Sequence, residues 1–154
     1  MKRPRHETPP GTLAFEHDLP HPPGTVWRAL SDPDLLAEWL LPPVGFEAEA
    51  GTAFAFMAPP QPGWDGIVSC RVLEAEPPER LRLAWSVGDL DTVVTFALTP
   101  TEAGTRLTIE QSGFRPDQEG NLRGAQYGWA TMSNRLRDLL GRLGAPPSPP
   151  PSST

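Results

Sequence analysis

Hydrophobic and polar residues alternate along much of the chain, and this period of two is typical of β-strands. In the segment 80–85, for example, Leu81, Leu83 and Trp85 share one face, while the other face is largely polar. One apolar face and one polar face indicate an antiparallel sheet that is covered on one side only. Seven strands are predicted in this way, at 13–19, 44–48, 52–57, 64–76, 80–85, 91–99 and 105–111.

Helical spacing replaces this alternation in three places. Two short helices are predicted between the first and second strands, at 24–30 and from Pro33, with Asp32 as the N-cap of the second. A long helix is predicted at 118–143, where Leu122, Ala125, Trp129, Met132, Leu136, Leu140 and Leu143 form one stripe. At 1.5 Å per residue this helix spans about 35–40 Å, enough to cross a small sheet. The sequence therefore predicts an α+β fold, in which a seven-stranded curved sheet surrounds a long C-terminal helix.

Both ends of the chain differ in composition from the middle. Residues 1–11 are polar and interrupted by proline, and residues 144–154 are mostly proline and serine. Proline removes backbone donors, so neither end is expected to form a helix or a strand. We predict two disordered tails and one domain at 12–143, which is long enough to bury a core without disulfides or metal.

Charge and cysteine content narrow the class of protein. The formal net charge is −6 and the arginines are scattered, whereas nucleic-acid binding requires a basic surface. Cys70 is the single cysteine, which excludes an intrachain disulfide and favours a small core residue over a reactive thiol. Neither a signal peptide nor an apolar run of membrane-spanning length is visible. The expectation is a cytoplasmic protein that does not insert into membranes.

Seven short motifs, in order and at consistent spacing, carry a family resemblance. They are Val26–Pro33, Trp39, Val72–Leu81, Trp85, Gly104–Thr108, Gly113-Phe114 and Gly128-Trp129. With these motifs the chain resembles, over residues 13–143, the bacterial homologues of the C-terminal domain of the activator of the heat-shock-protein-90 ATPase. These proteins belong to the START-like, birch-pollen-allergen-like (SRPBCC) superfamily. The resemblance implies a helix-grip fold but no shared catalytic residues, and Ser133 departs from the aliphatic residue usual at its position.

In a helix-grip fold, a cavity is expected between the concave face of the sheet and the long helix. The predicted lining consists of Phe54, Phe56, Trp85, Val94, Phe96, Leu107, Ile109, Gln126, Trp129, Met132, Ser133 and Leu136. Taken singly, each of these residues more commonly just fills a core, and the hypothesis of a cavity depends on the whole set. Ser133 and Gln126 either orient a ligand's polar end, or find ordinary partners, in which case Ser133 bonds the Trp129 carbonyl and Gln126 reaches solvent.

The mouth of the cavity is predicted at Trp39, Trp64 and Asp65. No second carboxylate can be placed beside Asp65, so the sequence indicates no acid–base pair and no catalytic residue. The three histidines lack metal-ligand spacing, and neither a metal nor a cofactor is expected.

Three functions remain open at this point. The first is a non-enzymatic protein that binds a small apolar or aromatic ligand in the cavity. The second is a co-chaperone-like module of the stress response that binds a protein partner through its surface, which an exposed apolar patch would favour. The third is a cavity enzyme of the polyketide-cyclase type, which would require two ionisable groups converging inside the cavity.

Overall fold

A computed structural model describes residues 11–60, 62 and 65–144. Its strands are β1 (Thr12–Leu19), β2 (Pro43–Val44), β3 (Ala53–Met57), β4 (Ile67–Glu76), β5 (Arg80–Val87), β6 (Leu90–Pro100) and β7 (Thr105–Ser112). Helices α1 (Pro23–Ser31) and α2 (Pro33–Trp39) follow β1, and the short helix η2 (Pro116–Gln118) leads into α3 (Glu119–Gly144). The predicted α+β helix-grip fold is confirmed.

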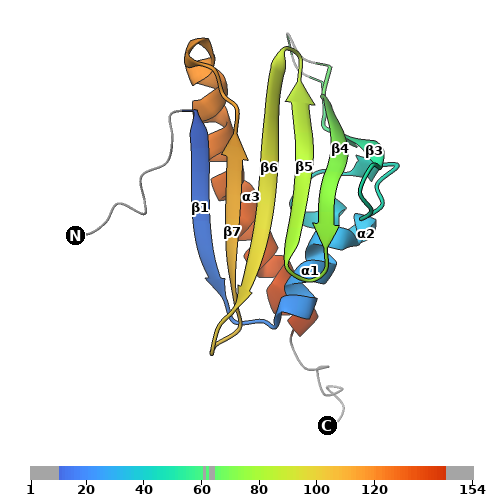
Figure 1. Cartoon of the computed structure of the whole chain (residues 1–154), viewed down its shortest axis with the longest axis vertical. Coiled ribbons are helices and arrows are strands. Elements are labelled where there is room, and N and C mark those ends of the chain that lie inside the picture. The colour runs from blue at the N-terminus through green and yellow to red at the C-terminus, as the bar shows by residue number, and fades with distance from the viewer. Residues whose placement is uncertain (1–10, 61, 63–64, 145–154) are drawn as a thin grey trace, which may run out of the picture.

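The seven strands form one antiparallel sheet in the order β1-β7-β6-β5-β4-β3-β2. Figure 1 shows the long helix α3 lying along one face of this sheet, with α1 and α2 on the same side. The other face is open to solvent, which explains the alternation along the strands. In β5, for example, Leu81, Leu83 and Trp85 are buried on the inner face, whereas Arg80 is exposed.

Proline and capping chemistry fixes the start of α2 as predicted. Asp32 lies in the extended region, and its side chain accepts a 2.9 Å hydrogen bond from the N–H of Asp34. Pro33 occupies the first turn, where no N–H is needed.

Two predicted strands are longer than the strands observed by three residues. The prediction of 44–48 was wrong beyond Val44, because Gly45 has a φ of +82° and turns the chain away from the sheet. The strand predicted from residue 64 begins at Ile67 instead. Gly66 precedes it with a φ of +85°, and a Cβ at this position would lie 2.1 Å from the carbonyl oxygen of Ala58.

The described fold includes two residues that the sequence assigned to the tails. The Gly11 carbonyl accepts hydrogen bonds from the N–H groups of Gly113 and Phe114, and Gly144 is the last residue of α3. The tail segments 1–10 and 145–154 lie outside the described residues. No helix among the residues described is both long and apolar enough to cross a membrane.

Candidate functional site

Aromatic side chains form a connected row across the inner face of the molecule. Neighbouring rings in the row have centroids 4.9–6.2 Å apart, in the range of favourable aromatic pairs. In order of contact the row consists of Phe46, Phe54, Phe56, Trp85, Trp129, Phe96 and Trp39. Trp129, on α3, joins the part of the row on β3 and β5 to the part on β6 and α2.

Most of the predicted lining residues lie on this inner face. Ten of them are buried: Phe54, Phe56, Trp85, Val94, Phe96, Leu107, Ile109, Trp129, Ser133 and Leu136. Met132 is half-buried and packs against the core. Gln126 is exposed, which agrees with the alternative that it reaches solvent and not with a place on the inner face beside Ser133. The stripe of α3 that the fold covers is narrower at this flank than the helical wheel suggests.

The predicted mouth is not assembled as expected. Trp39 is fully buried, and its indole N–H donates a 2.8 Å hydrogen bond to the Ala29 carbonyl, which makes it a core residue that holds α2 against α1. Asp65 is exposed and accepts a hydrogen bond from the N–H of Ile67, as turn aspartates commonly do. Trp64 lies outside the described residues.

A buried polar network, missed at the sequence level, holds Trp129 in place. The Trp129 indole N–H donates to the side-chain oxygen of Gln111 at 2.8 Å. The Gln111 amide nitrogen donates to the Thr92 hydroxyl at 2.9 Å, and that hydroxyl donates to the Trp85 carbonyl at 2.9 Å. The network joins α3 to β5, β6 and β7. The available signal was the phase of Gln111, which shares its strand face with Leu107 and Ile109.

Ser133 behaves differently from these groups. Its side chain is 4% exposed, and its hydroxyl oxygen has no hydrogen-bond partner among the described residues. The expected bond to the Trp129 carbonyl is therefore not formed, although Ser31 and Thr131 each make the corresponding bond four residues back, to Trp27 and Tyr127. A buried hydroxyl without a partner costs about 1–3 kcal/mol.

His17, on the edge strand β1, carries a second unpartnered polar atom. Its Nδ1 lies 3.2 Å from a guanidinium nitrogen of Arg137 on α3, and its Nε2 is buried without a hydrogen-bond partner in the described part of the chain. Burial and the charge of Arg137 lower the pKa of His17, so the ring is neutral at pH 7. Arg137 also donates to the Asp18 carbonyl, at 3.4 Å.

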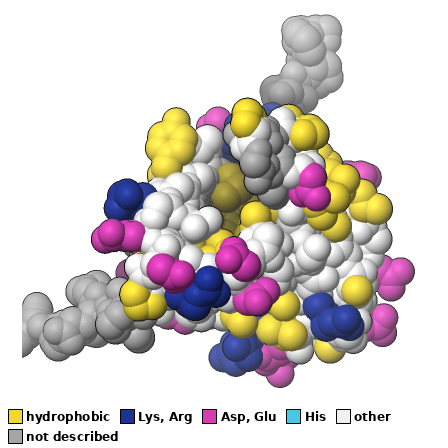
Figure 2. Space-filling view, turned by 90° about the horizontal axis from the view of Figure 1, so that it is seen from above, with side chains coloured by type: hydrophobic (Ala, Val, Ile, Leu, Met, Phe, Trp, Pro, Cys, Tyr) yellow, Lys and Arg dark blue, Asp and Glu magenta, His cyan; other side chains and the backbone are white. Residues whose placement is uncertain are grey.

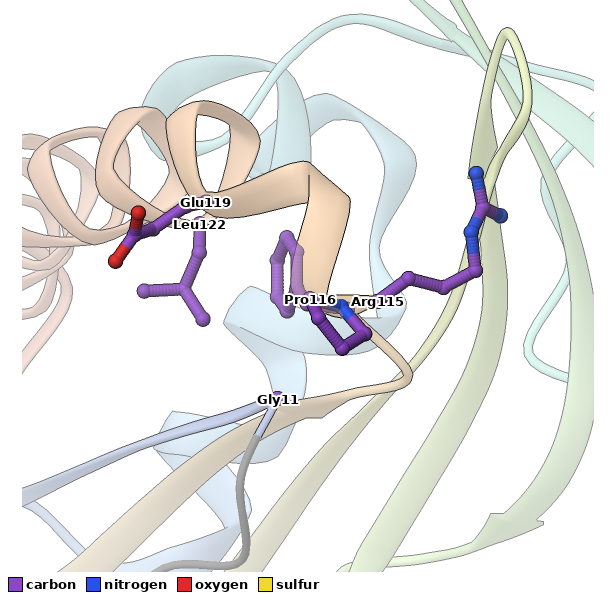
Figure 3. Close-up of a pocket in the computed structure, with 6 residues that line it drawn as sticks. Gly11, Arg115, Pro116, Glu119 and Leu122 are labelled. Carbon is purple, nitrogen blue, oxygen red and sulfur yellow. The ribbon is translucent and has the colours of Figure 1, made fainter.

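The surface is hollowed at the end of the molecule where α3 begins. Figure 2 looks onto this end and shows hydrophobic side chains at the bottom of the hollow, with charged side chains on the surface around it. A pocket of about 410 Å³ lies between the start of β1 and the first turn of α3, lined by Gly11, Phe114, Arg115, Pro116, Glu119 and Leu122. Figure 3 shows the Arg115 side chain pointing away from this pocket, and it bonds the Asp89 carbonyl.

The described residues contain no cluster of three His, Cys, Asp or Glu side chains that could hold a metal ion. Burial raises the pKa of the Cys70 thiol to about 12, so the thiol is protonated at neutral pH. The thiolate is the reactive form of cysteine, so this thiol is unreactive at neutral pH. Cys70 is buried and serves as a core residue.

Comparison with known proteins agrees with this architecture. The family described as "Activator of Hsp90 ATPase homolog 1-like protein" matches residues 20–141, which is most of the chain. The chain belongs to this family. No functionally curated protein matches the sequence.

Solved structures similar to this member of the activator-homologue family come from several bacteria. Protein MLL2253 from Mesorhizobium loti is 42% identical, with a TM-score of 0.79 over 85% of this chain and 97% of that chain. A protein from Rhodobacter sphaeroides is 26% identical, with a TM-score of 0.70 over 88% and 97% of the two chains. CalU16 from Micromonospora echinospora is 25% identical, with a TM-score of 0.71 over 84% and 75%.

Proposed function

We propose that this protein is a non-enzymatic binding protein that holds a small apolar or aromatic ligand between the sheet and α3. The observation that carries the proposal is the row of aromatic rings packed between the sheet and α3. Figure 2 also shows a hollow at one end of the molecule, with hydrophobic side chains at its bottom. Aromatic faces and edges favour stacking with planar ligands. The fold is compatible with ligand binding, and the polar groups of the inner face are few.

Two residues of the row are well placed to contact such a ligand. Trp85 and Phe54 retain 8% and 7% exposure, whereas Phe96 and Phe56 at the centre of the packing retain none. Met132 on α3 is half-buried, and a methionine side chain adapts its shape to irregular partners. A ligand that reached these side chains would replace water contacts of apolar surface with packing.

The test is a titration with an apolar environment-sensitive dye, followed by competition with a library of aromatic and fatty compounds. We expect micromolar binding, about −8 kcal/mol, which about twenty heavy atoms supply at about 0.3–0.4 kcal/mol each. Ser133→Leu adds bulk to the inner face and should weaken binding without destabilising the fold. Tyr127→Leu is the control, since Tyr127 is 77% exposed on α3.

A second function is favoured by a different surface. Val44, Met57 and Ile67 are 60%, 40% and 37% exposed on the outer face of β2, β3 and β4. Met57 and Ile67 are directly opposite each other, and Val44 is opposite Ala55 of the same face. This patch suits a co-chaperone-like protein interface. If the compounds fail to bind, and Met57→Glu abolishes binding to a chaperone partner, the second function replaces the first.

A further inference from the structure

The positions of α3 and β1 relative to each other follow from two hydrogen bonds. Trp129 bonds to Gln111, which lies directly opposite Leu13 of β1. Two helical turns later, Arg137 reaches His17 of β1. The helix rises about 12 Å over these eight residues and the strand about 13 Å over its four, and Figure 1 shows both running in the same direction. Residues 129–137 of α3 and residues 13–17 of β1 therefore cover the same length along this edge of the molecule.

Ser133 lies halfway along this stretch. At 100° per residue it points about 40° from Trp129 and about 40° from Arg137, hence between the aromatic row and β1. Its level corresponds to Phe15, whose side chain is on the same strand face as His17. Among the described residues, Ser133 Oγ and His17 Nε2 are both buried without a hydrogen-bond partner. From this helix and strand geometry we infer that they face the same region, and we call them the His17–Ser133 pair.

The chemistry of this pair is fixed by Arg137. A guanidinium only donates hydrogen bonds, so His17 Nδ1, 3.2 Å away, must accept one. The proton of the neutral ring is then on Nε2, which makes Nε2–H a buried donor without an acceptor. The Ser133 hydroxyl is a second donor. An oxygen acceptor would satisfy both groups. The charged neighbour of His17 on α3 is Arg137, while Asp18 on β1 is paired with Arg106.

We propose that the His17–Ser133 pair binds the acceptor oxygen of the ligand, while the ligand's apolar body packs toward the aromatic row. This inference rests on the proposed function and names the ligand class within it. The class is an aromatic or apolar compound that carries one carbonyl or carboxylate group. A ligand without such an oxygen leaves both donors unpaired and binds more weakly.

Three probes with one skeleton test this. They are 2-acetylnaphthalene, 2-naphthoate and 2-ethylnaphthalene, which carry a ketone, a carboxylate and no oxygen, respectively. We expect the full-length protein to bind the better oxygen-bearing probe about tenfold more tightly than 2-ethylnaphthalene, since one net hydrogen bond corresponds to about that factor. Arg137→Gln distinguishes the two oxygen sources, because it removes the positive charge but keeps an amide that can donate to His17 Nδ1, and should therefore weaken binding of the carboxylate more than binding of the ketone.

Substitutions test whether the preference for oxygen-bearing probes depends on the His17–Ser133 pair. Ser133→Ala and His17→Leu should each remove most of the tenfold preference and leave 2-ethylnaphthalene binding unchanged. Ser31→Ala and His21→Leu are the matched controls and should retain it, since the Ser31 hydroxyl already bonds the Trp27 carbonyl. In addition, the ¹⁵N resonance of His17 Nε2 should shift with the oxygen-bearing probe and not with the hydrocarbon.

The outcomes separate this inference from the proposed function. Equal affinity for all three probes, or a preference that survives Ser133→Ala in folded protein, overturns the inference and leaves the proposed function standing. A preference that vanishes in Ser133→Ala but not in Ser31→Ala supports both. If none of the probes binds and the dye does not bind either, both are overturned.

Discussion

Two groups of polar side-chain atoms are buried around α3, and they differ in hydrogen bonding. Within the described residues, the atoms of one group are paired and those of the other are not. In the centre, Gln111 bonds to both Trp129 and Thr92, so the amide's buried oxygen and nitrogen each have a partner. Ser133 Oγ on α3 and His17 Nε2 on β1 are instead buried without a hydrogen-bond partner in the part of the chain that the structure describes. A network in which every donor and acceptor is paired holds a helix in one position. Buried donors without an acceptor lower the stability of the fold and can bond an acceptor that a ligand supplies. On our proposal, the first group serves the fold and the second binds the ligand.

The largest effect is expected for the central region. Trp129 is 1% exposed and contacts the rings of Trp85 and Phe96, so Trp129→Ala should lower the free energy of unfolding by about 3–5 kcal/mol. Urea unfolding followed by circular dichroism measures it. A loss below about 1 kcal/mol would show that α3 does not dock through this side chain.

The next effect isolates the polar network. Gln111→Leu keeps the size of the side chain but removes the acceptor of the Trp129 indole N–H, and should destabilise by about 2–3 kcal/mol. Gln126→Leu is the matched control, because Gln126 is exposed on α3, and should change stability by less than about 0.5 kcal/mol. Similar losses in the two variants would contradict the assigned roles.

For Ser133, the change in the free energy of unfolding should have the opposite sign. Ser133→Ala removes a buried hydroxyl that has no hydrogen-bond partner among residues 11–60, 62 and 65–144, and should leave stability unchanged or raise it by up to about 1 kcal/mol. Ser31→Ala, which deletes a hydroxyl bonded to the Trp27 carbonyl, should instead lower stability by about 0.5–1 kcal/mol. If Ser133→Ala is the more damaging of the two in thermal unfolding, its hydroxyl has a structural partner in solution.

The smallest effect is a dependence on pH. The pKa of His17 is lowered in the folded protein by burial and by Arg137, so the unfolded chain takes up a proton first as the pH falls. The contribution of His17 is therefore fully present above pH 6.5 and decreases as the pH falls below it toward the folded-state pKa. Denaturant midpoints from pH 7.5 to 5 should show this decrease, and His17→Leu should reduce it. His21→Leu should leave it intact, and an unchanged slope in His17→Leu would refute the placement.

The sequence predicted the fold well because alternation and helical spacing report directly on burial. The strands, the cap at Asp32 and the stripe of α3 all follow from local patterns. The same patterns placed most of the inner-face residues, since Phe96 and Ile109 are in phase with their buried neighbours.

The sequence could not predict which groups bond to one another. Gln111 was in phase with buried residues, but its partners come from β6 and α3, which are far away in the chain. A helical wheel gives the direction of Gln126 but not the width of the stripe that the sheet covers. Trp39 was expected at the mouth, whereas packing on Phe96 and a hydrogen bond to the Ala29 carbonyl bury it.

The most direct test of the account is chemical-shift mapping by NMR with 2-acetylnaphthalene as the probe. The predicted result is saturable shifts of the indole N–H signals of Trp85 and Trp129 and of the methyl signals of Met132 and Ile109, at micromolar probe. Tyr127 and Val44, both exposed, should not shift. Shifts confined to Val44, Met57 and Ile67 on the outer face, or no shifts at saturating probe, would contradict a ligand site between the sheet and α3.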